Sequence, residues 1–168
     1  MVKILEKILA LWTILLCAVS CIQESEPVAA DLQTGDPIPD FTVMMNDGTY
    51  VSSEQLRRGM AVIVFFHTGC PDCQQTLPAL QRIYDEYRGK VGFALISREQ
   101  GDDEISPYWE SMGYTMPYSA QTDRTVYNLF ASSRVPRVYV CKNGFVKYMY
   151  DDSPIPSYSD LKGNLQDF

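Results

Sequence analysis

Residues 65–73 read Phe-Phe-His-Thr-Gly-Cys-Pro-Asp-Cys and lie where two differently patterned segments of the 168-residue chain meet. Residues 60–66, which lead into this turn, form a continuous apolar run of the length expected for a strand that is buried on both faces. Residues 70–87, which follow it, carry apolar side chains at helical spacing (Leu77, Leu80, Ile83, Tyr84 and Tyr87). The sequence therefore predicts a buried strand, a short turn and a helix that begins at the first cysteine.

The chemistry of this turn follows from the place of its two cysteines on the predicted helix. Cys70 and Cys73 are separated by two residues, so on the first helical turn their sulfur atoms come within bonding reach. Pro71 suits the first helical position, because an N–H there would have no partner in any case. Cys70 then lies over the free N–H groups and the positive end of the helix dipole, which favour the thiolate, the attacking species in disulfide exchange. Asp72 suits the dipole but opposes a negative charge on Cys70.

Two other uses of a cysteine pair fit this sequence less well. A structural zinc site needs about four ligands, and the chain has one histidine, His67, and no second pair of closely spaced cysteines. A disulfide that closes so short a loop restricts the unfolded chain little, so it has little structural value. A copper site of Cys70, Cys73 and His67 is chemically conceivable, but we rank it well below disulfide exchange. The sequence thus favours a redox-active dithiol, with no metal and no other cofactor.

Strand-like and helix-like segments alternate on both sides of this turn. Before it, residues 41–45 and 50–51 flank an Asp47-Gly48 turn, which predicts a hairpin, and Ser52 or Ser53 can cap a short helix through Leu56. After it we expect a buried strand over residues 91–96, short helices over 106–112 and 122–130, a hairpin of 138–141 with 145–150, and a last helix over 157–165. This alternation, with antiparallel pairing near the end, predicts an α/β domain with a mixed sheet.

The composition is that of a folded domain with an acidic surface. Hydrophobic residues make up 46% of the chain and charged residues 21%, and 14 Lys and Arg against 21 Asp and Glu give a net charge of −7. A net negative charge argues against electrostatic binding to nucleic acid. Of the five cysteines, Cys141 ends a predicted strand, and we expect it to be a small buried side chain.

The N-terminus is typical of an exported protein. Residues 1–20 combine two early lysines with an apolar run over 8–19, which is short for a membrane span and suits a signal peptide. Ala18-Val19-Ser20-Cys21 resembles the bacterial lipobox, which predicts lipidation of Cys21; an ordinary signal peptide or an N-terminal anchor are the alternatives. Residues 21–34 are polar and predict a tether, and residues 35–168 predict the folded domain. Each alternative places that domain outside the cytoplasm, where disulfides form.

Together these features resemble a known family. Cys-Pro-Asp-Cys at residues 70–73 after a hydrophobic strand, with Pro78 in the following helix, resembles the thioredoxin fold. Val135-Pro136 before the late hairpin looks like the cis-proline strand of that fold. With residues 35–41 (Gly-Asp-Pro-Ile-Pro-Asp-Phe), the tether and the lipobox, the chain is most similar to the membrane-anchored TlpA/ResA-type thioredoxins over about residues 35–165.

The resemblance implies a fold and a set of site residues. The expected fold is a thioredoxin-like central mixed β-sheet flanked by helices, with an N-terminal β-hairpin extension. Cys70 and Cys73 would form the redox-active disulfide, and Pro71 and Asp72 would tune it. Pro136 would be cis, and with Val135 it would hold the backbone of a partner.

The chain departs from the family pattern at three positions. Gly69 stands where a tryptophan commonly precedes the first cysteine, and Val64 and Thr76 stand where thioredoxins and ResA-type proteins carry acids. The usual proton acceptor for the buried thiol is therefore missing, and His67 or Asp72 could substitute. We favour a different interpretation of His67, as a partly exposed turn residue that packs near the site.

The resulting functional expectation is a thiol–disulfide oxidoreductase of the bacterial cell envelope, lipid-anchored and facing the periplasm or the cell surface. Its expected partners are protein disulfide or dithiol clients, with apocytochrome c as one example, and a membrane electron donor of the DsbD type that would make it a reductase. One alternative is a peroxiredoxin-like thiol peroxidase, since that family shares the Pro-Asp-Phe opening. Another is a redox-inert or metal-binding lipoprotein, for which Cys70→Ser would leave function intact.

Overall fold

The computed structural model describes residues 31–166, so the predicted signal peptide, Cys21 and most of the predicted tether lie outside the described residues. Its main sheet has four strands in the order β4-β3-β5-β6. These are β3 (Met60–Phe66), β4 (Gly92–Ser97), β5 (Arg137–Lys142) and β6 (Phe145–Tyr150). β3 runs parallel to β4 and antiparallel to β5, and β5 pairs antiparallel with β6, so the predicted mixed sheet is confirmed.

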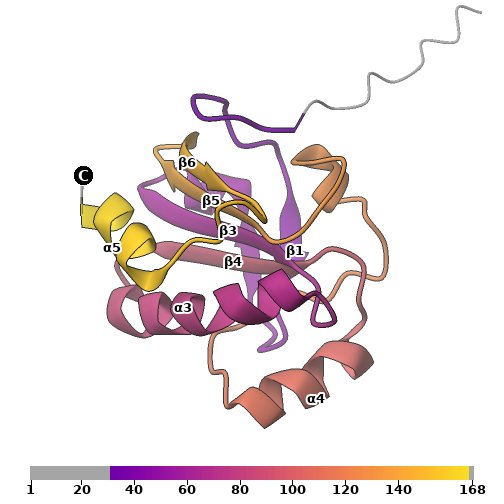
Figure 1. Cartoon of the computed structure of the whole chain (residues 1–168). Helices are drawn as coiled ribbons and strands as arrows, with labels where there is room; N and C mark the ends of the chain where they lie inside the picture. The colour runs from indigo at the N-terminus through magenta and orange to yellow at the C-terminus, as the bar shows by residue number, and fades with distance from the viewer. Residues whose placement is uncertain (1–30, 167–168) are drawn as a thin grey trace, which may run out of the picture.

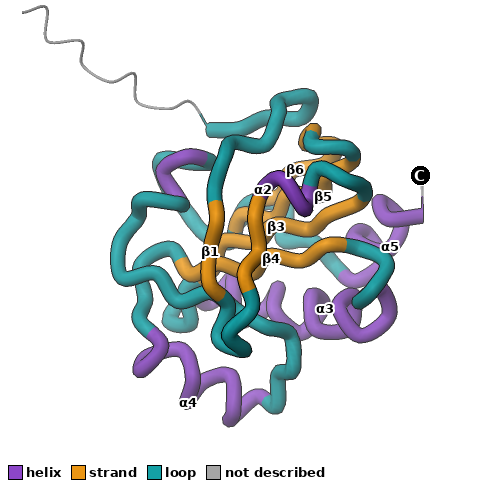
Figure 2. Tube along the Cα trace, turned by 180° about the vertical axis from the view of Figure 1, so that it is seen from behind, coloured by secondary structure: helices purple, strands orange, loops and turns teal. Residues whose placement is uncertain are grey.

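The layers explain why β3 is apolar throughout. Every residue of β3 after Met60 has no exposed surface. Helices α3 (Pro71–Tyr87) and α5 (Tyr158–Gln166) pack together on one face of the sheet (Figure 1). The hairpin of β1 (Thr42–Met44) and β2 (Tyr50–Ser52) lies across the other face (Figure 2). Ser52 caps the short helix α2 (Ser53–Leu56), as one of the two predicted caps.

Two predicted helices differ from the structure. α4 (Asp102–Met112) begins at Asp102 rather than at Ser106, because three acidic residues in its first turn suit the helix dipole, and Pro107 lies inside it. The helix predicted over residues 122–130 is wrong, since only a single 3₁₀ turn, η2 (Tyr127–Leu129), forms there. The Asp123 carboxylate accepts the N–H of Thr125 at 2.7 Å, and such a local bond competes with helix formation.

Residues 31–34, assigned from sequence to the tether, already contact the domain. The N–H of Leu32 donates to the carbonyl oxygen of Phe130 at 2.8 Å. The Asp31 carboxylate accepts bonds from the backbone and hydroxyl of Ser132 and pairs with the buried guanidinium of Arg137. Contacts between the N-terminal segment and the domain therefore include the loop that precedes β5.

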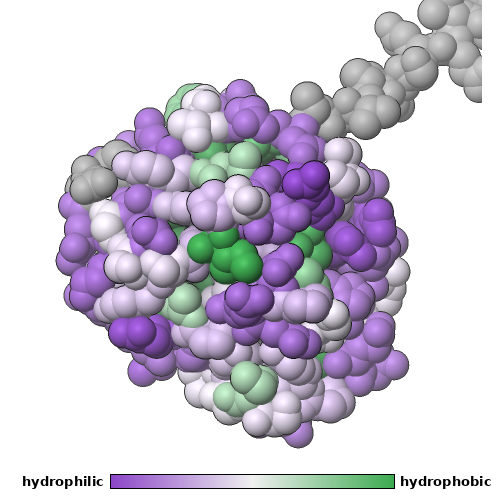
Figure 3. Space-filling model, viewed as in Figure 1, coloured by the Kyte–Doolittle hydropathy of each residue, from purple (hydrophilic) through white to green (hydrophobic). Residues whose placement is uncertain are grey.

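The surface of the domain is mostly polar on the face that α3 covers. Figure 3 shows hydrophilic side chains over most of this face and a small apolar patch near its centre. Within residues 31–166, no helix is both long enough and apolar enough to cross a membrane.

Candidate functional site

The two cysteines lie where β3 ends and α3 begins. Cys70 is the residue that precedes the first turn of α3, and its backbone is extended (φ −88°, ψ 120°). Its N–H donates to the carbonyl oxygen of His67, and its own carbonyl accepts the N–H of Gln74, both at 3.0 Å. Cys70 is partly exposed, whereas Cys73 is fully buried. One sulfur is therefore accessible at the helix N-terminus and the other lies beneath it.

Both site cysteines are free thiols in this structure, as is Cys141, so the disulfide between Cys70 and Cys73 stays a prediction. The Sγ of Cys70 donates to the carbonyl oxygen of Val135 at 3.3 Å. Burial raises the pKa of the Cys73 thiol; a backbone hydrogen bond from His67 opposes this, and the charges of Cys70 and Asp72 add to it. Cys73 is therefore protonated near neutral pH and must lose a proton before it can attack a sulfur.

The loop before β5 brings the predicted Val135–Pro136 pair to the dithiol. The peptide bond between these two residues is cis, as expected. Arg134, which precedes them, has a positive φ of 69°, and its carbonyl oxygen accepts the Tyr127 hydroxyl at 2.6 Å. The Val135 carbonyl thus lies beside Cys70 from a loop whose own backbone is held in place.

The structure also defines how His67 is placed. The N–H of Gly69 donates to its Nδ1 at 3.1 Å, so the neutral ring carries its proton on Nε2. Burial lowers the pKa of His67, and the positive charge of Arg98 lowers it further, so the imidazole is neutral at pH 7. A Cβ at position 69 would lie 3.3 Å from the ring, so a larger residue there would require the imidazole to shift slightly. This geometry supports the packing interpretation and not a cation beside the thiolate.

Two glutamines that were not predicted from the sequence hold the turn before Cys70. The buried Gln100 side chain accepts the N–H of Thr68 at 2.6 Å and donates to its hydroxyl at 2.9 Å. The Gln74 amide donates to the Thr68 carbonyl at 2.8 Å. No local motif marks Gln100: it reaches the turn because β4 lies parallel to β3, so the residues that follow the two strands meet at one edge of the sheet.

The positions where the family carries acids hold apolar or hydroxyl side chains. Val64 and Thr76 are both fully buried, and the Thr76 hydroxyl donates to the carbonyl oxygen of Asp72 at 2.8 Å. Within the described residues, no group of three or more His, Cys, Asp or Glu side chains is arranged to hold a metal ion.

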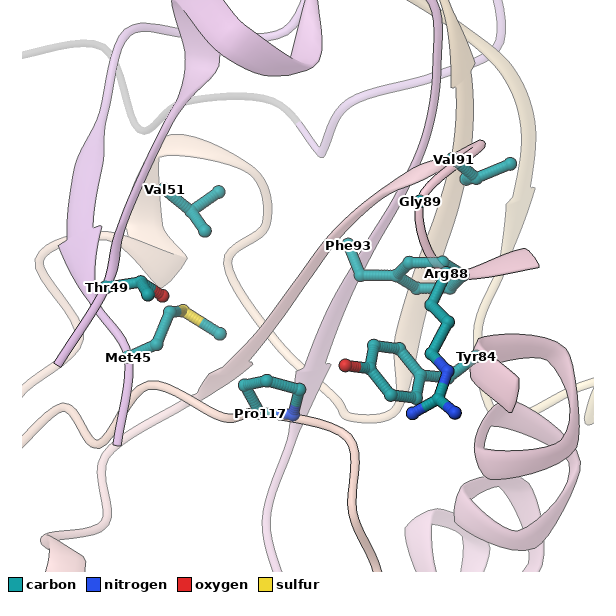
Figure 4. A pocket seen from close by; sticks show the side chains of 9 residues that line it. All are labelled: Met45, Thr49, Val51, Tyr84, Arg88, Gly89, Val91, Phe93 and Pro117. Carbon is teal, nitrogen blue, oxygen red and sulfur yellow. The ribbon is translucent and has the colours of Figure 1, made fainter. Parts of the chain in front are cut away.

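Two hollows differ in their relation to the sulfurs. One, of about 330 Å³, contains Cys70 in its wall. The other, of about 200 Å³, lies between the β1–β2 hairpin and the end of α3, where Tyr84 and Arg88 face Met45 and Thr49 (Figure 4). Only the first borders the dithiol.

The family assignment rests on a match over most of the chain. The model of the AhpC/TSA family matches residues 34–149, which include both cysteines and the Val135–Pro136 pair. The chain belongs to this family. Its relatives include the thiol-disulfide oxidoreductase ResA of Geobacillus thermodenitrificans, 23% identical over 135 residues (79% of this chain, 76% of ResA). They also include peroxiredoxin Q, chloroplastic, of Oryza sativa subsp. japonica, 27% identical over 137 residues (74% of this chain, 62% of that protein).

A solved structure of a putative protein disulfide isomerase from Bacteroides thetaiotaomicron confirms the thioredoxin-like fold of this AhpC/TSA protein. The TM-score is 0.73 at 17% identity, with 83% of this chain and 90% of that chain covered. The chain spans 52% and 62% of the length of the first curated relatives that it matches. The comparisons therefore agree with the predicted thioredoxin-like fold.

Proposed function

We propose that this protein is a thiol–disulfide oxidoreductase that reduces protein disulfides in the bacterial cell envelope through Cys70 and Cys73. The observation that carries the proposal is the placement of an accessible thiol at the N-terminus of α3, above a buried one and beside the Val135 carbonyl. The relative named ResA and the family match support the same class of reaction.

The proposed reaction transfers two electrons to a client disulfide. The Cys70 thiolate bonds to one client sulfur, the client S–S bond breaks and one client thiolate leaves. Cys73 then loses its proton and bonds to the Cys70 sulfur, which releases the second client thiolate. Overall two electrons and two protons pass from the dithiol to the client, and Cys70 and Cys73 become a disulfide. In this cycle Pro71 and Asp72 shape the dithiol, and Val135 and Pro136 hold the client backbone.

The first test is the equilibrium potential of the Cys70–Cys73 pair in the full chain, solubilised in detergent and titrated in graded thiol buffers. We expect a value near that of thioredoxin, about −270 mV. A value near about −120 mV would overturn the reducing direction. The absence of any reversible two-electron transition would remove the enzyme proposal altogether and favour a redox-inert binding module.

A second test looks for clients in cells. The variant Cys73→Ala cannot resolve the mixed disulfide, so it should accumulate partners linked to Cys70. The matched control is Cys141→Ala, which removes a fully buried thiol on β5 and should accumulate none. Recovery of no linked protein with Cys73→Ala would count against the proposed cycle.

The cellular setting is part of the proposal. Lipidation at Cys21 would hold the domain at an envelope membrane, and a DsbD-type membrane protein would return electrons to the disulfide. Apocytochrome c is the client class that we propose first. Cys21→Ala should move the protein from the membrane fraction to the soluble fraction; unchanged fractionation would show that another segment anchors it.

One observation favours a second candidate, a thiol peroxidase. Two arginines, Arg98 and Arg134, border the hollow beside Cys70, and one relative of this chain is named peroxiredoxin Q. Thr68 lies two residues before Cys70, although its hydroxyl oxygen is already bonded to Gln100. Fast consumption of hydrogen peroxide by the reduced protein, lost in Cys70→Ser, would favour this candidate over disulfide reduction.

A further inference from the structure

The hollow beside Cys70 combines a thiol with two guanidinium groups. It has a volume of about 330 Å³ and is bordered by side chains from the dithiol turn, the end of β4, the loop before β5 and the segment after β6. These side chains are His67, Cys70, Arg98, Arg134, Val135 and Asp152. A group bound in this hollow would therefore lie next to the sulfur that attacks.

The backbone of each arginine is hydrogen-bonded to a neighbouring element. The N–H of Arg98 donates to the carbonyl oxygen of Phe66 at 2.8 Å, directly after β4. The carbonyl of Arg134 is held by the Tyr127 hydroxyl at 2.6 Å. Both arginines therefore belong to backbone segments that are hydrogen-bonded to neighbouring elements, and both border the hollow.

The hollow carries two positive charges in an otherwise acidic protein, and each already has an acidic neighbour. The chain carries a net charge of −7, Asp152 pairs with Arg134 at the hollow, and Glu99 pairs with Arg98. His67 contributes no charge, since burial and Arg98 lower its pKa. An anion that enters the hollow therefore meets two guanidinium groups beside Cys70, in competition with the carboxylates of Glu99 and Asp152.

The existing partners of the two arginines leave them able to bind another carboxylate. Glu99 pairs with Arg98 at 2.5 Å, but the same carboxylate also accepts two bonds from Arg124, so one negative charge serves two guanidinium groups. Arg134 pairs with Asp152 through one contact of 3.2 Å, and its side chain is 61% exposed. An ion pair as exposed as that of Arg134 contributes little stability, so an incoming carboxylate can replace Asp152 there at small cost.

We propose that this hollow is a carboxylate subsite, and that the protein prefers disulfides whose cysteines have Asp or Glu as direct neighbours in the client chain. The inference rests on the proposed function, because it names the substrate class of the same dithiol. Carboxylates of the client bind Arg98 and Arg134 while Cys70 attacks the adjacent sulfur. The dithiol supplies both electrons, the client disulfide is reduced to two thiols, and Cys70 and Cys73 become a disulfide.

The test uses two matched peptide disulfides, the dimers of Gly-Glu-Cys-Glu-Gly and Gly-Gln-Cys-Gln-Gly. The full chain in detergent is reduced beforehand, and its single-turnover rate is measured with each dimer. Each rate is divided by the rate of the same dimer with dithiothreitol, which corrects for intrinsic disulfide reactivity. We expect the corrected rate to be about tenfold higher for the acidic dimer, and the preference to shrink with added salt as charges are screened.

Substitutions of the two arginines test whether the preference for acidic dimers arises in the hollow. Arg98→Gln and Arg134→Gln should each lower the ratio of acidic to neutral rates about threefold, and Arg98→Lys should restore part of it. The matched control is Arg88→Gln, which removes one exposed charge beside the separate cavity at the end of α3 (Figure 4) and should leave the ratio unchanged. Two independent arginine variants keep the test decisive if one of them folds poorly.

Each outcome separates the two proposals. Equal corrected rates for both dimers with the unaltered protein would overturn the carboxylate subsite and leave disulfide reduction standing. A preference that survives in both arginine variants would also overturn it, because the selectivity would then arise elsewhere. If the reduced protein reacts with neither dimer, the proposed function fails, and the subsite falls with it.

Discussion

The Sγ of Cys70 lies 3.3 Å from the carbonyl oxygen of Val135 and donates a hydrogen bond to it, although the two residues are 65 positions apart. A thiolate or a disulfide sulfur has no proton to donate, so this carbonyl loses its partner when Cys70 ionises or reacts. The freed carbonyl can then accept a backbone N–H from a bound client, which links the chemistry of the sulfur to client binding.

The first prediction separates this hydrogen bond from the reactivity of the sulfur. Cys70→Ser keeps an O–H donor for the Val135 carbonyl, so we expect the free energy of unfolding to change by less than about 0.5 kcal/mol. Disulfide exchange should be abolished, because the hydroxyl does not form the attacking thiolate. Urea unfolding and single-turnover reduction of a peptide disulfide measure the two effects; a large loss of stability would show that the sulfur itself holds the loop.

The second prediction concerns the two glutamines that bind Thr68. Gln100→Leu leaves a buried N–H and a hydroxyl of Thr68 without their partner, so we expect the free energy of unfolding to fall by about 2 kcal/mol. Gln74→Leu is the matched control, because Gln74 is exposed and water can replace its single bond to the Thr68 carbonyl; we expect a change within about 0.5 kcal/mol. Equal effects in urea unfolding would contradict this difference.

The parts of the fold that could be predicted are those with a local cause. The apolar run of β3, the Asp47-Gly48 turn and the cap at Ser52 each depend on residues next to one another, and each was found. The start of α4 was missed because Ser106-Pro107 gives a strong local signal, whereas the acidic first turn after Gly101 gives a weaker one.

The site was predictable only as far as its local motif. The placement of Cys70 and Cys73 follows from the turn itself, and Val135–Pro136 from the family resemblance. Gln100 and Arg98 reach the dithiol from beyond β4, and Arg134 reaches it from the loop before β5. Such contacts depend on which strands are neighbours in the sheet, and no spacing within the sequence encodes that.

The third prediction concerns the pair of Asp31 with Arg137. The side chain of Arg137 is 4% exposed, so removal of its carboxylate partner leaves a buried charge with less compensation. We expect Asp31→Ala to lower the free energy of unfolding by about 2 kcal/mol. The control Asp40→Ala breaks a pair whose carboxylate is 87% exposed and should cost less than about 1 kcal/mol.

The Asp31 effect should also depend on pH with a definite sign. Burial tends to raise the pKa of Asp31, but bonds from Ser132 and the charge of Arg137 outweigh it and lower the pKa below its ordinary value. The contribution of Asp31 is therefore complete above the ordinary carboxyl pKa and is lost as the pH falls through the lowered value. Unfolding of the two proteins should differ at pH 7 and converge in strong acid; a difference that persists there would mean that packing, not charge, is responsible.

The fourth prediction follows from the buried Cys73 thiol. Burial raises its pKa, so near neutral pH only a small fraction of Cys73 is thiolate, and that fraction grows about tenfold per pH unit below the pKa. The release of the second client thiol, which requires attack by Cys73, should therefore accelerate by almost tenfold from pH 7 to 8 and again from pH 8 to 9.

Stopped-flow measurement of the two thiols released from a peptide disulfide separates this phase from the first, and Cys73→Ser should lack it. A second phase that does not change over this range would show that Cys73 is already ionised in the mixed disulfide, and thus that a proton acceptor takes the place of the acids that Val64 and Thr76 replace.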